Sequence, residues 1–151
     1  MRLSIMSGPS HELLGRLLRD VSRSFYLTMR VLPGAIRPQI GLAYLLARTT
    51  DTVADTALLP VEQRLDALQQ LRDRILGNRH VPLDLADVVQ SQGTHAEREL
   101  LGRLEEALCF LASFPEADRR MIRDVLSVLL TDQELDLTRY ATASRDRILA
   151  L

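Results

Sequence analysis

Four polar residues in the segment GLAYLLARTTDTVADT are spaced to share one face of a helix: Tyr44, Arg48, Asp51 and Asp55. At about 100° per residue, their side chains fall within an arc of roughly 60°. Two carboxylates one turn apart, beside a guanidinium and a phenol, can hold a divalent cation next to an anionic group. Mg²⁺ favours carboxylate oxygens and is usually bound jointly with substrate phosphates. The alternative is that these residues form the solvated face of an ordinary amphipathic helix.

The overall composition is that of one globular domain of 151 residues with a net charge of −1. All 19 basic residues are arginine, but no basic patch accompanied by aromatic residues is present, so we expect no nucleic-acid partner. No apolar signal segment and no apolar stretch of about 18 residues occurs, so a cytoplasmic location is expected. Cys109, in the run ALCFLASF, is predicted to be buried. The three histidines (His11, His80 and His95) lack the spacing of metal ligands.

Hydrophobic periodicity predicts an almost entirely helical chain without strands. The expected helices cover 11–21, a segment from Pro38 to before Pro60, 61–76, a short segment after Pro82, 94–111 and 117–138. Gly77 is expected to stop the helix over 61–76, and Thr94 with Glu97 has the spacing of a capping box. The short connections predict a single domain over 1–151.

The last residues of the chain resemble the start of another helix. Ser144 is predicted to be its N-cap, and the sequence after it allows only two turns, which are marginal in water. Either this end frays or the natural chain continues. Apolar residues near it are expected to form an exposed patch that promotes self-association: Leu129, Leu130, Ile148, Leu149 and Leu151.

Two segments resemble the squalene/phytoene synthase family. The run VSRSFYLTMRVLPGAIRPQIGLAYLLARTTDTVADT is similar to the family's N-terminal signature, in which an SRSF-type segment precedes a helix with a DxxxD motif. The run LLTDQELDLTRY resembles the GQELDL-type segment of bacterial squalene synthase-like members, with Asp132 where that segment usually has glycine. The resemblance implies an all-α isoprenoid synthase-type fold, of which this chain would be the N-terminal part.

The resemblance also implies an activity. Family members join two prenyl diphosphates head to head, through a cyclopropyl intermediate, in a cavity between helices where Mg²⁺ ions grip diphosphate. We therefore expect a Mg²⁺-dependent prenyltransferase that converts farnesyl diphosphate into presqualene diphosphate or a squalene-type product. The prenyl chain length, the use of NADPH, the oligomeric state and peripheral contact with a membrane are left open.

The site residues are carried over from the resemblance one position at a time. Asp51 and Asp55 match the first acidic motif and would ligate Mg²⁺, and Arg23 and Arg48 would bind diphosphate oxygens. Tyr44 would face the cationic intermediate. The remaining expected substrate-binding residues are Ser24, Phe25, Gln133 and Asp136. Without the resemblance, Phe25 would be interpreted as a core aromatic residue.

The family's second acidic motif has no counterpart in this sequence, because it lies beyond a helix that the sequence does not contain. The resemblance therefore implies half of a metal site, and we expect the 151-residue chain to be inactive alone. The alternative is a non-catalytic helical module that retains the family scaffold for binding or assembly. A downstream reading frame with a second acidic motif would favour the enzyme.

Overall fold

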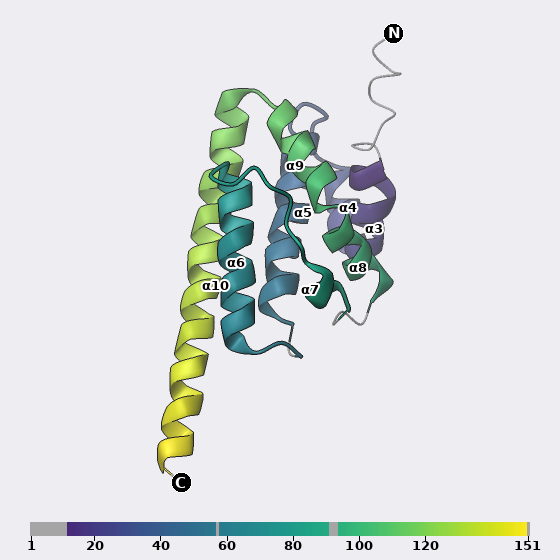
Figure 1. The fold of residues 1–151 in the computed structure, drawn as a ribbon. Helices are drawn as coiled ribbons and strands as arrows, with labels where there is room; N and C mark the ends of the chain where they lie inside the picture. Colours follow the sequence, from purple (N-terminus) through teal and green to yellow (C-terminus); the bar gives the residue numbers. More distant parts are fainter. Residues whose placement is uncertain (1–11, 57, 91–93, 151) are drawn as a thin grey trace.

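The computed structural model describes residues 12–56, 58–90 and 94–150, and all regular structure within them is helical, which confirms the all-α prediction. Figure 1 shows the arrangement. The elements are η1 (Leu13–Leu17), α3 (Leu18–Val21), α4 (Arg23–Met29), α5 (Arg37–Ala54), α6 (Val61–Leu76), α7 (Ala86–Gln90), α8 (His95–Gly102), α9 (Leu104–Ser113) and α10 (Glu116–Ala150). None of the described helices is long and apolar enough to cross a membrane.

Helix α5 is the centre of the fold. It packs against α6 and α10, and it also contacts η1, α4, α8 and α9 (Figure 1). Gln39 near the start of α5 pairs with Asp118 near the start of α10, and Asp51 near its end pairs with Gln133 further along α10. The two helices therefore run parallel, with α6 antiparallel beside them.

Apolar side chains from nearly all of the helices fill the core. Leu42, Leu45, Leu46 and Val53 are at most 1% exposed, so the apolar face of α5 is fully covered. Threonines of this helix are buried as well, because their hydroxyls donate to main-chain carbonyls. Thr49 donates to the carbonyl of Leu45 at 2.9 Å. This satisfies its polar group inside the core.

The ends of α5 and α6 follow local signals that the sequence contains. Pro38 occupies the first turn of α5, where a missing N–H has no consequence. At the other end, Arg64 of α6 donates to the carbonyl oxygen of Ala54 at 3.1 Å and so caps α5. Helix α6 ends where predicted, at Gly77, whose φ of 84° lies in the left-handed region.

The predicted helix over 94–111 is wrong in one respect, because the chain forms two helices there. Thr94 caps α8 as expected, accepting a hydrogen bond from the amide of Glu97 at 3.2 Å. The backbone then leaves the helical region at Arg103. In α9 the buried positions are Leu104, Ala107, Leu108 and Leu111. Cys109 lies outside this stripe and is exposed, so its predicted burial is also wrong.

The predicted end of the last long helix is wrong too. Helix α10 runs without interruption over 35 residues, and Ser144 lies inside it instead of capping a new helix. No glycine or proline occurs between Glu116 and Ala150 to stop it. Its C-terminal turns project beyond the other helices in Figure 1.

The expected apolar patch on α10 is confirmed only in part. Leu130 is fully buried against the bundle, which corrects its predicted exposure. Leu129, Ile148 and Leu149 are 36%, 70% and 77% exposed. Leu151 lies outside the described residues, as does His11.

An arginine–glutamate network ties α8 to the first helices, and it predicts acid sensitivity. Arg16 donates to Glu99 at 3.0 Å, and this bond is the main reason why the pKa of Glu99 is lowered. Because the pKa of Glu99 is lower in the folded state, its ionised carboxylate stabilises the fold at pH values above the ordinary glutamate pKa. This stabilisation is lost as the pH falls through the folded-state pKa. We expect Glu99→Gln to lower the free energy of unfolding at pH 7, and we expect this loss relative to the parent to shrink as the pH falls below the ordinary glutamate range. Urea unfolding at pH 7 and at acidic pH measures both free energies, and a loss that does not depend on pH would contradict the prediction.

Candidate functional site

The four polar residues of α5 form one face of the helix, as their spacing predicts. Tyr44, Arg48 and Asp51 are partly buried, and Asp55 is exposed at the C-terminal end of the helix. Because the opposite face is held in the core, the helix cannot rotate and the four side chains must stay on the accessible side. The carboxylates therefore have a fixed place beside Arg48.

Helix α4 brings an aromatic ring to this face. The rings of Phe25 and Tyr44 are stacked, with centroids 3.8 Å apart and planes 10° from parallel. Ser22 fixes the start of α4, because its hydroxyl accepts from the amide of Phe25 at 3.3 Å. The two rings make an apolar, electron-rich surface one turn of α5 away from Arg48.

Arg23 and Ser24, the other expected residues of this segment, are exposed. Among the side-chain hydrogen bonds of the described residues, none joins either of them to the acidic pair of α5, in which Asp51 accepts from Gln133. The main-chain carbonyl of Ser24 accepts from Thr28 within α4 at 3.0 Å. The structure thus brings Phe25 to the acidic face, but it leaves the expected roles of Arg23 and Ser24 without a supporting contact.

Helix α10 contributes the second side of the site. The amide of Gln133 donates a hydrogen bond to Oδ1 of Asp51. Asp136, about one turn further on, is exposed, and its Oδ1 lies 3.9 Å from a terminal guanidinium nitrogen of Arg139. Gln133 and Asp136, both expected from the sequence, therefore lie on the part of α10 that meets the C-terminal end of α5.

A pocket of about 420 Å³ opens at this junction. Its lining residues are Ala54, Asp55, Arg64, Gln133, Asp136, Leu137 and Tyr140. Sequence reasoning did not select Arg64 or Tyr140. Tyr140 follows Gln133 by seven residues and Asp136 by four, so helical spacing could have found it. Arg64 comes from another helix, and no local pattern points to it.

The electrostatics of the site favour a cationic ligand at the carboxylates. Burial, followed by repulsion from Asp55, raises the pKa of Asp51, while the charge of Arg48 and the bond from Gln133 act in the opposite direction. A divalent cation between Asp51 and Asp55 would remove the repulsion.

Arg48 offers a matching site for an anion. Its Nε is buried and has no hydrogen-bond partner in the described part of the protein. Buried donors without a partner are rare in folded proteins, and a guanidinium is well suited to phosphate oxygens. An anionic ligand beside the carboxylates would give this guanidinium a partner.

The donor set suits a Mg²⁺ ion that is bound jointly by the protein and a substrate. In the described residues, no group of three or more histidine, cysteine, aspartate or glutamate side chains could enclose a metal ion. Asp51 and Asp55 supply two carboxylates one turn apart on α5. Mg²⁺ keeps several waters and commonly shares its coordination sphere with substrate phosphates, so two carboxylates fit it without a closed protein cage.

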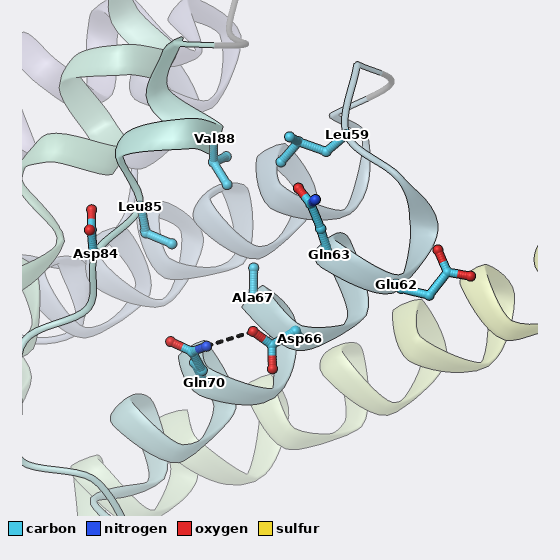
Figure 2. Close-up of a pocket in the computed structure, with 9 residues that line it drawn as sticks. All are labelled: Leu59, Glu62, Gln63, Asp66, Ala67, Gln70, Asp84, Leu85 and Val88. Atoms are coloured by element: carbon cyan, nitrogen blue, oxygen red, sulfur yellow. Dashed lines mark hydrogen bonds between the residues drawn. The ribbon is translucent and has the colours of Figure 1, made fainter.

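A second pocket, of about 300 Å³, lies between α6 and the segment that leads into α7 (Figure 2). Its walls include Leu59, Leu85 and Val88, and Gln70 donates to Asp66 at 2.7 Å on one side. None of the expected site residues lines it. This pocket is thus separate from the acidic face of α5.

Comparison with known protein families shows to which family the chain belongs. Residues 18–149 match the squalene/phytoene synthase family. The chain belongs to this family. The matched range contains all nine expected site residues and nearly the whole described fold.

Curated members of the squalene/phytoene synthase family are similar to part of the chain. A squalene synthase, LSS, from Botryococcus braunii is 38% identical over 60 residues, which are 40% of this chain and 13% of the relative. A bifunctional lycopene cyclase/phytoene synthase from Blakeslea trispora is 36% identical over 56 residues, 37% of the chain and 9% of that relative. The chain thus matches only a small part of the length of these relatives. No solved structure is significantly similar to it.

Proposed function

We propose that this squalene/phytoene synthase family chain serves in a Mg²⁺-dependent prenyltransferase that joins two prenyl diphosphates head to head. Farnesyl diphosphate is the proposed substrate, and presqualene diphosphate or a squalene-type product is the proposed outcome. The observation that carries the proposal is the combination on α5 of two adjacent carboxylates with a buried, unpaired Arg48 Nε. A metal–diphosphate pair fits both halves of this arrangement.

The proposed roles follow from the position of each side chain. Asp51 and Asp55 would hold Mg²⁺, which when bound supplies neutralisation of the negative charge that grows on a departing diphosphate. Arg48 would donate to diphosphate oxygens with its planar guanidinium. A good leaving group needs this neutralisation, because diphosphate departs with its bonding electrons and leaves an allylic cation.

The stacked rings of Phe25 and Tyr44 are suited to the prenyl end of the substrate. Phe25 and Tyr44 present their stacked pair next to Arg48 on α5, where a prenyl chain attached to the diphosphate would begin. The face of an aromatic ring attracts a cation, and the apolar surface keeps water from it. Tyr44 is therefore the proposed residue that faces the allylic cation.

The proposal is tested by the binding of inorganic diphosphate to the purified chain, measured by calorimetry with and without Mg²⁺. We expect binding that requires Mg²⁺ and that the double variant Asp51→Asn/Asp55→Asn loses, because an amide carries no charge to hold the cation. Asp66→Asn, which removes an exposed carboxylate of α6 in the other pocket, is the control and should bind like the parent. Binding that is unaffected by EDTA or by the double variant would overturn the proposal.

A further inference from the structure

Two glutamine–aspartate hydrogen bonds join the same pair of helices, α5 and α10. At one end Gln39 of α5 donates to Oδ2 of Asp118 at 3.3 Å. At the other end Gln133 of α10 donates to Oδ1 of Asp51. Both glutamines are partly buried, and in both the amide oxygen is buried without a hydrogen-bond partner in the described residues. The two bonds thus share their residue types and the two helices that they join.

The two bonds differ in the carboxylate that they hold. Asp118 lies in the first turn of α10, away from the pocket at the end of α5. Asp51 belongs to the acidic pair and shares its face with Asp55 and Arg48. The Gln133 bond therefore restrains a side chain of the candidate site, whereas the Gln39 bond restrains only the packing of the two helices.

The donor on Asp51 is also chemically suited to a metal ligand. A glutamine amide is neutral, so it orients the carboxylate without cancelling the negative charge that attracts a cation. An arginine or lysine in its place would compete with the cation for that charge. The bond from Gln133 uses one lone pair of Oδ1, and it leaves the other lone pair of Oδ1 and both lone pairs of Oδ2 without this donor.

We propose that Gln133 is a positioning residue for the acidic pair, whose neutral amide fixes the orientation of the Asp51 carboxylate between α5 and α10 for binding a divalent cation. The inference rests on the proposed function and assigns Gln133 a task different from direct contact with substrate. Groups that hydrogen-bond to metal ligands typically change metal affinity 10- to 100-fold when they are removed.

The test compares matched variants of the full chain. Gln133→Met and Gln39→Met each remove one amide while keeping a side chain of similar length. Gln133→Asn keeps an amide but shortens its reach by one methylene group. Metal affinity is measured by calorimetric titration of Mn²⁺ in the presence of inorganic diphosphate, and thermal unfolding is followed by circular dichroism. Asp51→Asn serves as the reference for loss of the ligand itself.

We expect both Gln133 variants to weaken Mn²⁺ binding by about tenfold or more, and Gln39→Met to change it by less than about twofold. The two methionine variants should lower the melting temperature by similar amounts, because each breaks one bond between the same helices. Equal effects of Gln133→Met and Gln39→Met on affinity, or no effect of either Gln133 variant, would overturn the positioning role.

Failure of the inference can be told apart from failure of the proposed function. If Asp51→Asn loses metal binding while both Gln133 variants bind normally, only the positioning role is wrong. If Asp51→Asn binds like the parent, or if the parent does not bind, the metal site on α5 is wrong and the inference falls with it. Should Gln133→Met fail to fold, Gln133→Asn decides the outcome.

Discussion

Replacement of Asp51 or Asp55 by asparagine is expected to lower turnover of farnesyl diphosphate by two orders of magnitude or more while leaving the helical fold intact. Both side chains are on the accessible face of α5, and neither belongs to the apolar core. Loss of metal-held charge at a leaving group removes several kcal/mol of transition-state stabilisation. Each 1.36 kcal/mol corresponds to about a factor of ten in rate.

The assay measures kcat at saturating Mg²⁺ in the protein that carries this chain, with circular dichroism to verify the fold. Asp66→Asn again provides a control for the loss of one carboxylate on a neighbouring helix. A change of less than about threefold in kcat for either α5 variant would rule out a metal-ligating role for that residue.

Replacement of Arg48 by lysine is expected to reduce the affinity for diphosphate and the rate by ten- to a hundredfold, nearly as much as replacement by alanine. Arg48 is partly buried, and its Nε has no hydrogen-bond partner within the described protein, so a ligand would not have to replace an internal bond at this atom. A lysine ammonium is a point charge and cannot reproduce the planar pair of donors that arginine offers to a phosphate. Hydrogen bonds to charged groups are each worth about 1.5–3 kcal/mol.

Arg120→Lys is the matched control for this experiment. Arg120 is 71% exposed on α10 and pairs with Glu116 at 2.9 Å, so its replacement should leave diphosphate binding unchanged. If the Arg48→Lys variant binds diphosphate and turns over like the parent, Arg48 supplies only general positive charge or packing.

Helical spacing and helix-end signals in the sequence predict the polar stripe of α5 and the end of α6. The acidic stripe of α5 follows from helical spacing alone, and its apolar counterpart is buried as that spacing requires. The end of α6 at Gly77 was equally predictable, because a left-handed residue there favours glycine. These features need no knowledge of the rest of the chain.

The errors arose where two local signals compete. Ser144 has the chemistry of an N-cap, yet it lies in a stretch without glycine or proline, and the helix continues through it. At Arg103 a predicted helix is interrupted. The chain leaves the helical region there, although hydrophobic periodicity favours a single helix. The break sets the register of α9 and leaves Cys109 exposed.

Side-chain contacts between different helices could not be predicted. Gln133 was selected through the family resemblance, but its bond to Asp51 depends on how α10 packs on α5. Arg64 caps α5 and lines the pocket from a third helix, and its own sequence neighbours contain no sign of either role. Such contacts depend on tertiary packing, which a single sequence does not specify position by position.

We propose above that Asp51, Asp55 and Arg48 hold a metal-bound prenyl diphosphate on α5. The most direct test is a crystal structure of the protein with Mn²⁺ and a farnesyl diphosphate analogue whose bridging oxygen is replaced by sulfur. We predict an anomalous scattering peak for Mn²⁺ at the carboxylates of Asp51 and Asp55, with diphosphate oxygens at the guanidinium of Arg48 and the prenyl chain at the Phe25–Tyr44 pair. Mn²⁺ and diphosphate bound together elsewhere on the protein, with this face empty, would contradict the claim.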